Sequence, residues 1–177
     1  MQKILFSDLV EKYANRTDED VAFEAGRAIL AGDYSIKNLR AIVMWKSPRT
    51  TGKKLETNKS IVEGALMSAV HNIDREGLAI ESLLVMKGVG IPVASAIMTA
   101  LDPTRYTIID YRALATLQID SLPPEERFCS ENAKDSIGEY LDYLNCCKRL
   151  ARANGISLRG LDYALWQYSY EEGLDWI

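Results

Sequence analysis

Apolar residues recur every three or four positions along almost the whole chain, which is the spacing of amphipathic helices. The clearest stripe runs from residue 58 to residue 71 and comprises Ile61, Val62, Ala65, Leu66, Ala69 and Val70. Only the run Thr107-Ile108-Ile109 resembles a strand, which is too little to build a sheet. The pattern therefore predicts an all-α fold of about eight helices.

Capping residues, glycines and prolines divide this pattern into separate helices. The predicted helix starts are Thr17 (a capping box with Asp20), Ser35, Ser136 and Ser157. The predicted ends are Gly32, Ser47-Pro48 and Asn154-Gly155. A short helix at 80–87 is expected to lead into Gly88. No repeat or linker interrupts the pattern, so the chain is expected to form one domain over 1–177.

The segment "MKGVGIPVASAIMTALDPTRYTIIDYRA" holds an unusual concentration of special residues. Gly88-Val89-Gly90 predicts a sharp turn between two helices, since glycine adopts positive φ at little cost. Pro92 suits the first turn of the second helix. Amides at such a helix start can hold a phosphate oxygen. The alternative is a corner between two helices with no ligand.

Asp110 follows the run 107–109 and precedes the helical stretch "YRALATL". This is the N-cap position, where most aspartates only accept hydrogen bonds from the first-turn amides. The same amides would also keep a carboxylate ionised if it faced a cleft. Both interpretations stay open on the sequence.

Together these features resemble the helix–hairpin–helix DNA glycosylase superfamily. The family pattern is an apolar residue, Gly-Val-Gly, an alanine in the following helix, and an apolar residue with an aspartate about twenty residues later. The matching residues are Leu84, Gly88, Val89, Gly90, Ala94 and Ile109-Asp110. The match lies within residues 81–117, and the helical remainder is compatible with it.

The resemblance implies a cleft between two helical lobes and base-excision repair of double-stranded DNA that carries a damaged base. Lys87, Gly88, Val89 and Gly90 would grip the DNA backbone without reading sequence. The damaged nucleotide would swing out of the stack. Asp110 would stabilise the positive charge on the sugar as the base leaves, or orient the attacking water.

Two departures from the family pattern narrow this expectation. Strand-cutting members carry a nucleophilic lysine two residues after the second glycine, and that position is Pro92 here. We therefore expect a monofunctional hydrolase, without Schiff-base chemistry from that position. "DYRAL" also replaces the commoner Asp-Thr/Ser-His, so we expect a pocket that differs from that of the family.

The segment "MWKSPRTTGKKLETNKS" is the other candidate for DNA contact. Trp45 predicts stacking on a base, and Lys46 and Arg49 predict phosphate contacts. Tyr106 and Tyr111 bracket Asp110 and are further candidates for the base pocket. The alternatives are a tryptophan in the core beside a solvated basic loop, and tyrosines in ordinary packing. Asn58 either reads a base edge or, preferably, caps the following helix.

Composition sets outer limits on these hypotheses. The 177 residues are 47 % hydrophobic and 26 % charged, and the net charge is −4. The acidic total argues against a protein that coats DNA. However, residues 37–59 hold seven basic side chains and one acid: Lys37, Arg40, Lys46, Arg49, Lys53, Lys54, Lys59 and Glu56.

The candidate cofactor sites are few. His71 is the only histidine, and the cysteines are Cys129, Cys146 and Cys147, with no Cys-X-X-Cys pair. We therefore expect free thiols and no metal, cofactor or iron–sulfur cluster. No apolar run is long enough to cross a membrane. The expected location is the cytoplasm, on the nucleoid if the protein binds DNA.

Two functions from different classes are compatible with the sequence. One is a monofunctional DNA glycosylase that uses Asp110. The other is a non-catalytic helix–hairpin–helix module that binds DNA or another protein, which the acidic total and the short chain favour. An unrelated helical enzyme is a third, weaker alternative.

Overall fold

The computed structural model describes residues 6–13, 19–48, 55–118, 122, 127–128, 130 and 135–174. Within these ranges the chain forms nine helices and no strand, so the predicted all-α class is confirmed. The helices are α1 (Phe6–Tyr13), α2 (Asp20–Leu30), α3 (Ile36–Lys46), α4 (Lys59–His71), α5 (Glu76–Leu84), α6 (Ile91–Leu101), α7 (Tyr111–Leu117), α8 (Ile137–Ala153) and α9 (Leu158–Glu171).

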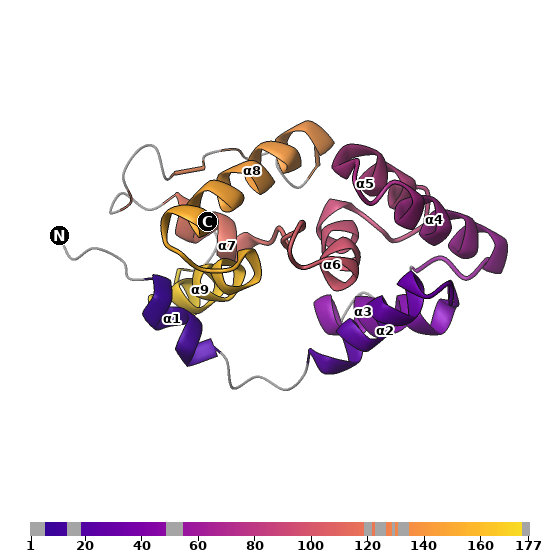
Figure 1. The fold of residues 1–177 in the computed structure, drawn as a ribbon, viewed down its shortest axis with the longest axis horizontal. Coiled ribbons are helices and arrows are strands. Elements are labelled where there is room, and N and C mark those ends of the chain that lie inside the picture. Colours follow the sequence, from indigo (N-terminus) through magenta and orange to yellow (C-terminus); the bar gives the residue numbers. More distant parts are fainter. Residues whose placement is uncertain are drawn as a thin grey trace.

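The helices form two groups that lie side by side in Figure 1. Helices α2 to α6 make one group, with α6 packed against α2, α3 and α5. Helices α1, α7 and α8 surround α9 in the other group. The contact between α5 and α8 also joins the two groups. The connection from α6 to α7 passes between them, and it carries Asp110.

Helix α6 is the centre of the first group. Every residue from Ala94 to Leu101 is buried, which explains why this stretch has no charged face. Its two polar side chains, Ser95 and Thr99, donate their hydroxyls to carbonyls of the same helix. Helix α2 approaches it so closely that a Cβ on Gly26 would lie 2.0 Å from the carbonyl oxygen of Ala100. Gly26 therefore permits the contact between these two helices.

Helix α1 is the element that the sequence pattern did not predict. It is short, and an isolated helix of this length is unstable in water. Its stability comes from packing on α9, where Phe6 and Leu9 are buried and Val10 lies against Gly160. Such long-range packing leaves little trace in the local sequence.

Most of the predicted capping residues act as expected. The side chains of Asn58, Ser136 and Ser157 accept hydrogen bonds from first-turn amides of α4, α8 and α9. Ser35 stands at the N-cap of α3, but its side chain makes no capping bond, so that part of the prediction is wrong. Thr17 lies outside the described residues.

The helix expected at 80–87 is displaced in the structure. It begins at Glu76 and ends at Leu84, before the glycine turn. The thiols of Cys146 and Cys147 are buried and unbridged, and burial raises the pKa of Cys147 well above its ordinary value. Cys129 lies outside the described residues. In the described part of the chain, no helix has the length and apolar character needed to cross a membrane.

Candidate functional site

The segment that leads to Asp110 is extended but has no partner strand. Side chains from α8 satisfy its carbonyl groups instead. The hydroxyl of Tyr140 donates to the carbonyl of Thr107 at 3.1 Å, and that of Tyr143 donates to the carbonyl of Ile108 at 2.9 Å. Both tyrosines are fully buried. A buried carbonyl without a partner is costly, so these bonds hold the segment in place.

An amide of the same segment is hydrogen-bonded to α6. The amide of Ile109 donates to the hydroxyl of Ser95 at 3.2 Å, and Ser95 itself donates to the carbonyl of Pro92. The backbone of Ile108 also lowers the pKa of Asp162, against the larger effect of burial. Ile109, the residue before Asp110, is therefore hydrogen-bonded to α6, the helix that follows the glycine turn.

Asp110 occupies the N-cap of α7 and also forms an ion pair. Its Oδ1 accepts from the amide of Ala113 at 3.0 Å, and its Oδ2 lies 3.0 Å from Nζ of Lys46, the last residue of α3. The Asp110 side chain is 20 % exposed and the Lys46 side chain 15 %. Burial alone would raise the pKa of Asp110, but the charge of Lys46 and the amide of Ala113 outweigh it. The net pKa is lowered, so the carboxylate is ionised at neutral pH.

A second charged group adjoins this pair from α9. Arg159 binds Glu19, with Nη2 2.5 Å from Oε1, and it also pairs with Asp162 one turn along its own helix. Tyr163 donates its hydroxyl to Glu19. Burial raises the pKa of Asp162 to about 6, and the negative charge of Asp110 acts in the same direction, while Arg159 opposes both.

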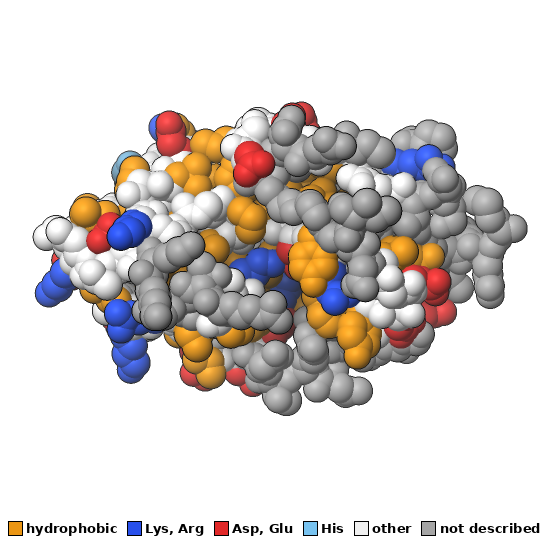
Figure 2. Space-filling view, turned by 180° about the vertical axis from the view of Figure 1, so that it is seen from behind, with side chains coloured by type: hydrophobic (Ala, Val, Ile, Leu, Met, Phe, Trp, Pro, Cys, Tyr) orange, Lys and Arg blue, Asp and Glu red, His pale blue; other side chains and the backbone are white. Residues whose placement is uncertain are grey.

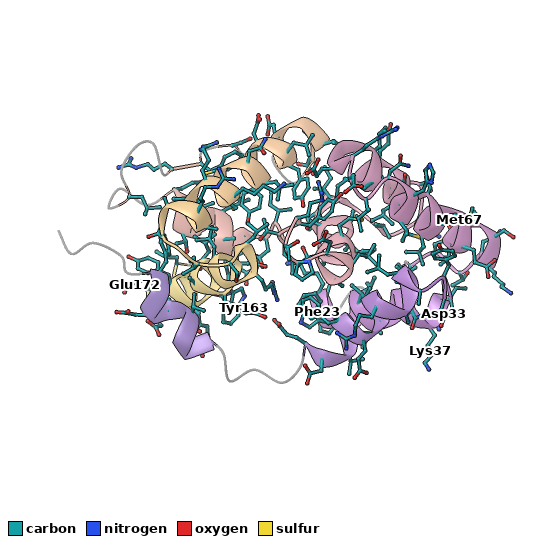
Figure 3. All side chains as sticks on the ribbon, in the orientation of Figure 1. Phe23, Asp33, Lys37, Met67, Tyr163 and Glu172 are labelled. Carbon is teal, nitrogen blue, oxygen red and sulfur yellow. The ribbon has the colours of Figure 1, made fainter. Side chains whose placement is uncertain are left out.

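Aromatic rings surround the guanidinium of Arg159. Its Cζ lies 4.3 Å from the ring centre of Tyr163, 5.3 Å from that of Trp45 and 5.8 Å from that of Phe23. Figure 3 shows Phe23 and Tyr163 facing each other from α2 and α9. The cation therefore bridges both helix groups beside the Lys46–Asp110 pair, through contacts that stabilise a buried guanidinium.

No model of a protein family, no characterised protein and no solved structure matches this chain. The resemblance noted in the sequence therefore stays a prediction, and the geometry of the site carries the functional argument. Seen from behind in Figure 2, basic and acidic side chains meet near the middle of the molecule, with hydrophobic side chains around them.

The glycine turn connects α5 to α6. Gly88 has a φ of +80°, in the left-handed region, whereas Gly90 is extended with a φ of −95° and forms the N-cap of α6. The side chain of Val89 is buried and that of Lys87 is exposed. The carbonyl of Lys87 accepts from the amide of Glu56 at 2.8 Å. Only Gly88 is required by the backbone of the turn.

The other predicted site residues are distributed unevenly around Asp110. Trp45 packs on the core and on Arg159, and Lys46 pairs with Asp110 instead of standing free on the surface as a phosphate contact. Tyr111 is 41 % exposed, next to Asp110. Tyr106 is fully buried and donates its hydroxyl to the carbonyl of Ile73, so it packs in the core. Arg49 lies outside the described residues.

Sequence reasoning missed three residues that organise this site: Ser95, Arg159 and Asp162. The signal was present for Asp162, which lies between Leu161 and Leu165 on the face of α9 that is buried. A charged residue on an apolar helix face needs a partner, and such residues mark functional or structural networks. In the described part of the chain, no cluster of His, Cys, Asp and Glu could hold a metal ion.

Proposed function

We propose that this chain is a monofunctional DNA glycosylase that hydrolyses the N-glycosidic bond of a damaged, flipped-out base. The observation that carries the proposal is the state of Asp110. Its carboxylate is ionised, partly buried and partly exposed, and it stands at the end of a segment anchored on α6. A fixed carboxylate of this kind suits a reaction in which positive charge develops on a sugar.

In this reaction the bond between C1′ and the base nitrogen breaks, and the base leaves with the electron pair. Asp110 stabilises the cationic sugar while water attacks C1′. The proton of that water passes to the carboxylate or to solvent, and an abasic sugar remains. Lys46 keeps Asp110 in its charged form, which is the form that the reaction needs.

The turn between α5 and α6 supports the DNA-binding part of the proposal. The first amides of any helix have no partner within the helix, and their dipole favours an anion. Helix α6 begins beside exposed Lys87 and Gly88. A phosphate seated there would lie on the same helix that anchors Ile109 and therefore Asp110.

The experiment is base release from a panel of duplexes, each with one damaged base. We expect the wild-type protein to release at least one base. Asp110→Asn should lower that rate by about 10²-fold or more. Asp142→Asn, an exposed carboxyl on α8, is the matched control and should retain the rate. Binding of the same duplexes should weaken steeply with added salt for all three proteins.

One observation favours a second function, a helix–hairpin–helix module that binds without catalysis. Asp110 already has two partners, Lys46 and the amide of Ala113, as a purely structural aspartate would. If no duplex of the panel loses a base while salt-dependent binding persists, this second function replaces the first. If binding is also absent, both the glycosylase and the DNA-binding form of the module are rejected.

A further inference from the structure

A further set of charged and aromatic side chains lies where α7 packs against α9, and Arg112 is at its centre. Cζ of Arg112 lies 5.2 Å from the ring centre of Tyr111 on its own helix. It lies 5.2 Å from the ring centre of Trp166 and 5.7 Å from that of Tyr170, both on α9. Together these four residues form the arginine–aromatic cluster.

The rings of this cluster are only partly covered by protein. Tyr111 is 41 % exposed and Tyr170 is 60 % exposed, while Trp166 is half-buried. Trp166 and Tyr170 are one turn apart on α9 and stack, with ring centres 5.3 Å apart and an angle of 11° between their planes. Large rings that are grouped at a surface mark interaction sites, whereas singly exposed ones are ordinary. The cluster therefore offers flat ring surface to a partner.

The charge of Arg112 is not neutralised by the described part of the chain. Within that part, no carboxylate or carbonyl group accepts a hydrogen bond from its guanidinium, which is half-buried among the rings. Arg159 differs, because it pairs with Glu19 and Asp162. The donors of Arg112 are thus available to an anion, and a guanidinium binds phosphate well because its planar fork matches the phosphate oxygens.

Flat rings beside an unneutralised guanidinium match the two parts of a nucleotide. A base stacks on an aromatic ring or on a guanidinium plane, and the phosphate pairs with the cation. Inside a duplex each base face is covered by the next base, so only unpaired bases can stack on protein rings. Glu171 and Glu172 are exposed just beyond Tyr170, so a phosphate is favoured on the side of Arg112.

We propose that the arginine–aromatic cluster binds unpaired nucleotides of a DNA single strand. The exposed rings hold the bases by stacking, and Arg112 holds a phosphate. Tyr111 directly follows Asp110, so the bound nucleotides flank the target base beside the proposed reaction site. The inference rests on the proposed function for the kind of nucleic acid, DNA, and adds that the protein binds unpaired strands more tightly than duplexes.

The test uses the whole chain and a fluorescently labelled oligothymidine of about 12 nucleotides, a length within the range that one such site covers. Oligothymidine does not pair with itself, so its bases stay available for stacking. The comparison is the same strand paired with oligoadenine. Fluorescence anisotropy measures both affinities, and neither measurement needs base release. We expect the single strand to bind more tightly than the duplex.

Tyr170 allows a test of stacking that does not disturb the fold, because the residue is exposed. Tyr170→Leu keeps an apolar side chain but removes the flat ring, and it should weaken binding of the single strand by about 5-fold or more. Tyr170→Phe keeps the ring and should retain the affinity. Thermal unfolding of both variants shows that they are folded.

Arg112→Gln tests the phosphate contact. It should weaken binding and lower the slope of log affinity against log salt concentration by about 0.7, the value for one phosphate contact on a single strand. Arg152→Gln is the matched control, since Arg152 is exposed in the last turn of α8 and lies outside the cluster. It removes the same charge and should leave both the affinity and the slope unchanged.

The inference is overturned if the wild-type protein does not bind the single strand, or binds the duplex as tightly. It is also overturned if folded Tyr170→Leu keeps the wild-type affinity, or if Arg152→Gln weakens binding as much as Arg112→Gln. A wild-type dimer that Tyr170→Leu dissociates would make the cluster a contact between copies of the chain instead. Single-strand binding without base release from any lesion would reject the glycosylase alone, whereas base release without single-strand binding would reject only this inference.

Discussion

Nζ of Lys46 and Oδ2 of Asp110 lie 3.0 Å apart, although 64 residues separate them in the chain. Lys46 ends α3 in one helix group, and Asp110 begins α7 in the other. The ion pair thus joins the two groups where the connection from α6 passes between them. It sets the ionisation of Asp110 and links two segments that have no evident relation in the sequence.

Replacing Lys46 by Ala should destabilise the protein through Asp110. The carboxylate would stay partly buried with the amide of Ala113 but without its cation, and an incompletely paired charge costs about 1–3 kcal/mol. Urea denaturation monitored by circular dichroism measures the free energy of unfolding. Lys87→Ala is the control on an exposed lysine, with an expected change within about 0.5 kcal/mol. Equal effects of the two substitutions would refute this role of the pair.

Asp162 should make stability depend on pH between about 4 and 6. Its pKa is raised to about 6 in the folded protein, so the folded state binds the proton more tightly than the unfolded chain. The free energy of unfolding contributed by this group therefore falls as pH rises through that window and is constant above it. The full change is about 3 kcal/mol if Asp162 titrates alone.

The measurement for Asp162 is a series of denaturation curves across that window. Asp162→Asn should flatten the dependence of the free energy of unfolding on pH, whatever its effect on stability at any one pH. Asp110 contributes in the opposite sense, because its lowered pKa makes its stabilisation disappear only as the pH falls below its ordinary titration range. If the free energy of unfolding of Asp162→Asn depends on pH as steeply as that of the wild type, another group titrates in this window.

Tyr143→Phe should remove a hydrogen bond that positions the segment before Asp110. The carbonyl of Ile108 would then be buried without the donor that now lies 2.9 Å away, at a cost of about 1–2 kcal/mol. Tyr170→Phe is the matched control, since Tyr170 is 60 % exposed on α9 and should lose almost nothing. Base release by Tyr143→Phe should also slow while DNA binding persists. If Tyr143→Phe leaves the free energy of unfolding unchanged, packing alone holds the segment.

The two glycines of the turn should respond differently to alanine. Gly88→Ala places a Cβ in the left-handed region and should cost about 1–2 kcal/mol. Gly90→Ala has an ordinary φ, and its Cβ would meet nothing closer than Pro92 Cδ at 3.8 Å, so the fold should tolerate it. Thermal unfolding of the two variants measures this difference in stability.

The DNA affinity of Gly90→Ala adds a second readout for this turn. If a DNA backbone approaches the turn closely, the added methyl group should weaken binding although the fold is intact. Equal destabilisation by both alanines would contradict the assignment of Gly88 as the one strained position.

The helical character of the chain could be predicted because it depends on patterns among residues close together in the sequence. Apolar spacing, capping residues and the glycine turn together indicated eight of the nine helices in the described ranges, and Asn58, Ser136 and Ser157 marked starts that their side-chain hydrogen bonds confirm. Ser35 shows the limit of this reasoning, since its hydroxyl stays unbonded at the N-cap it was expected to serve. Helix α1 shows another limit, because its stability depends on α9.

The sequence by itself thus determined the all-α class, the glycine turn and the capping position of Asp110, since each depends on neighbours within a few residues. Tertiary structure alone decided that Lys46 pairs with Asp110, that Tyr143 holds Ile108, and that Arg159 lies among rings from both helix groups. The physical reason is the separation along the chain over which each kind of interaction acts. Capping and periodicity act within one or two turns of chain, whereas ion pairs and buried hydrogen bonds join whatever segments the packing brings together.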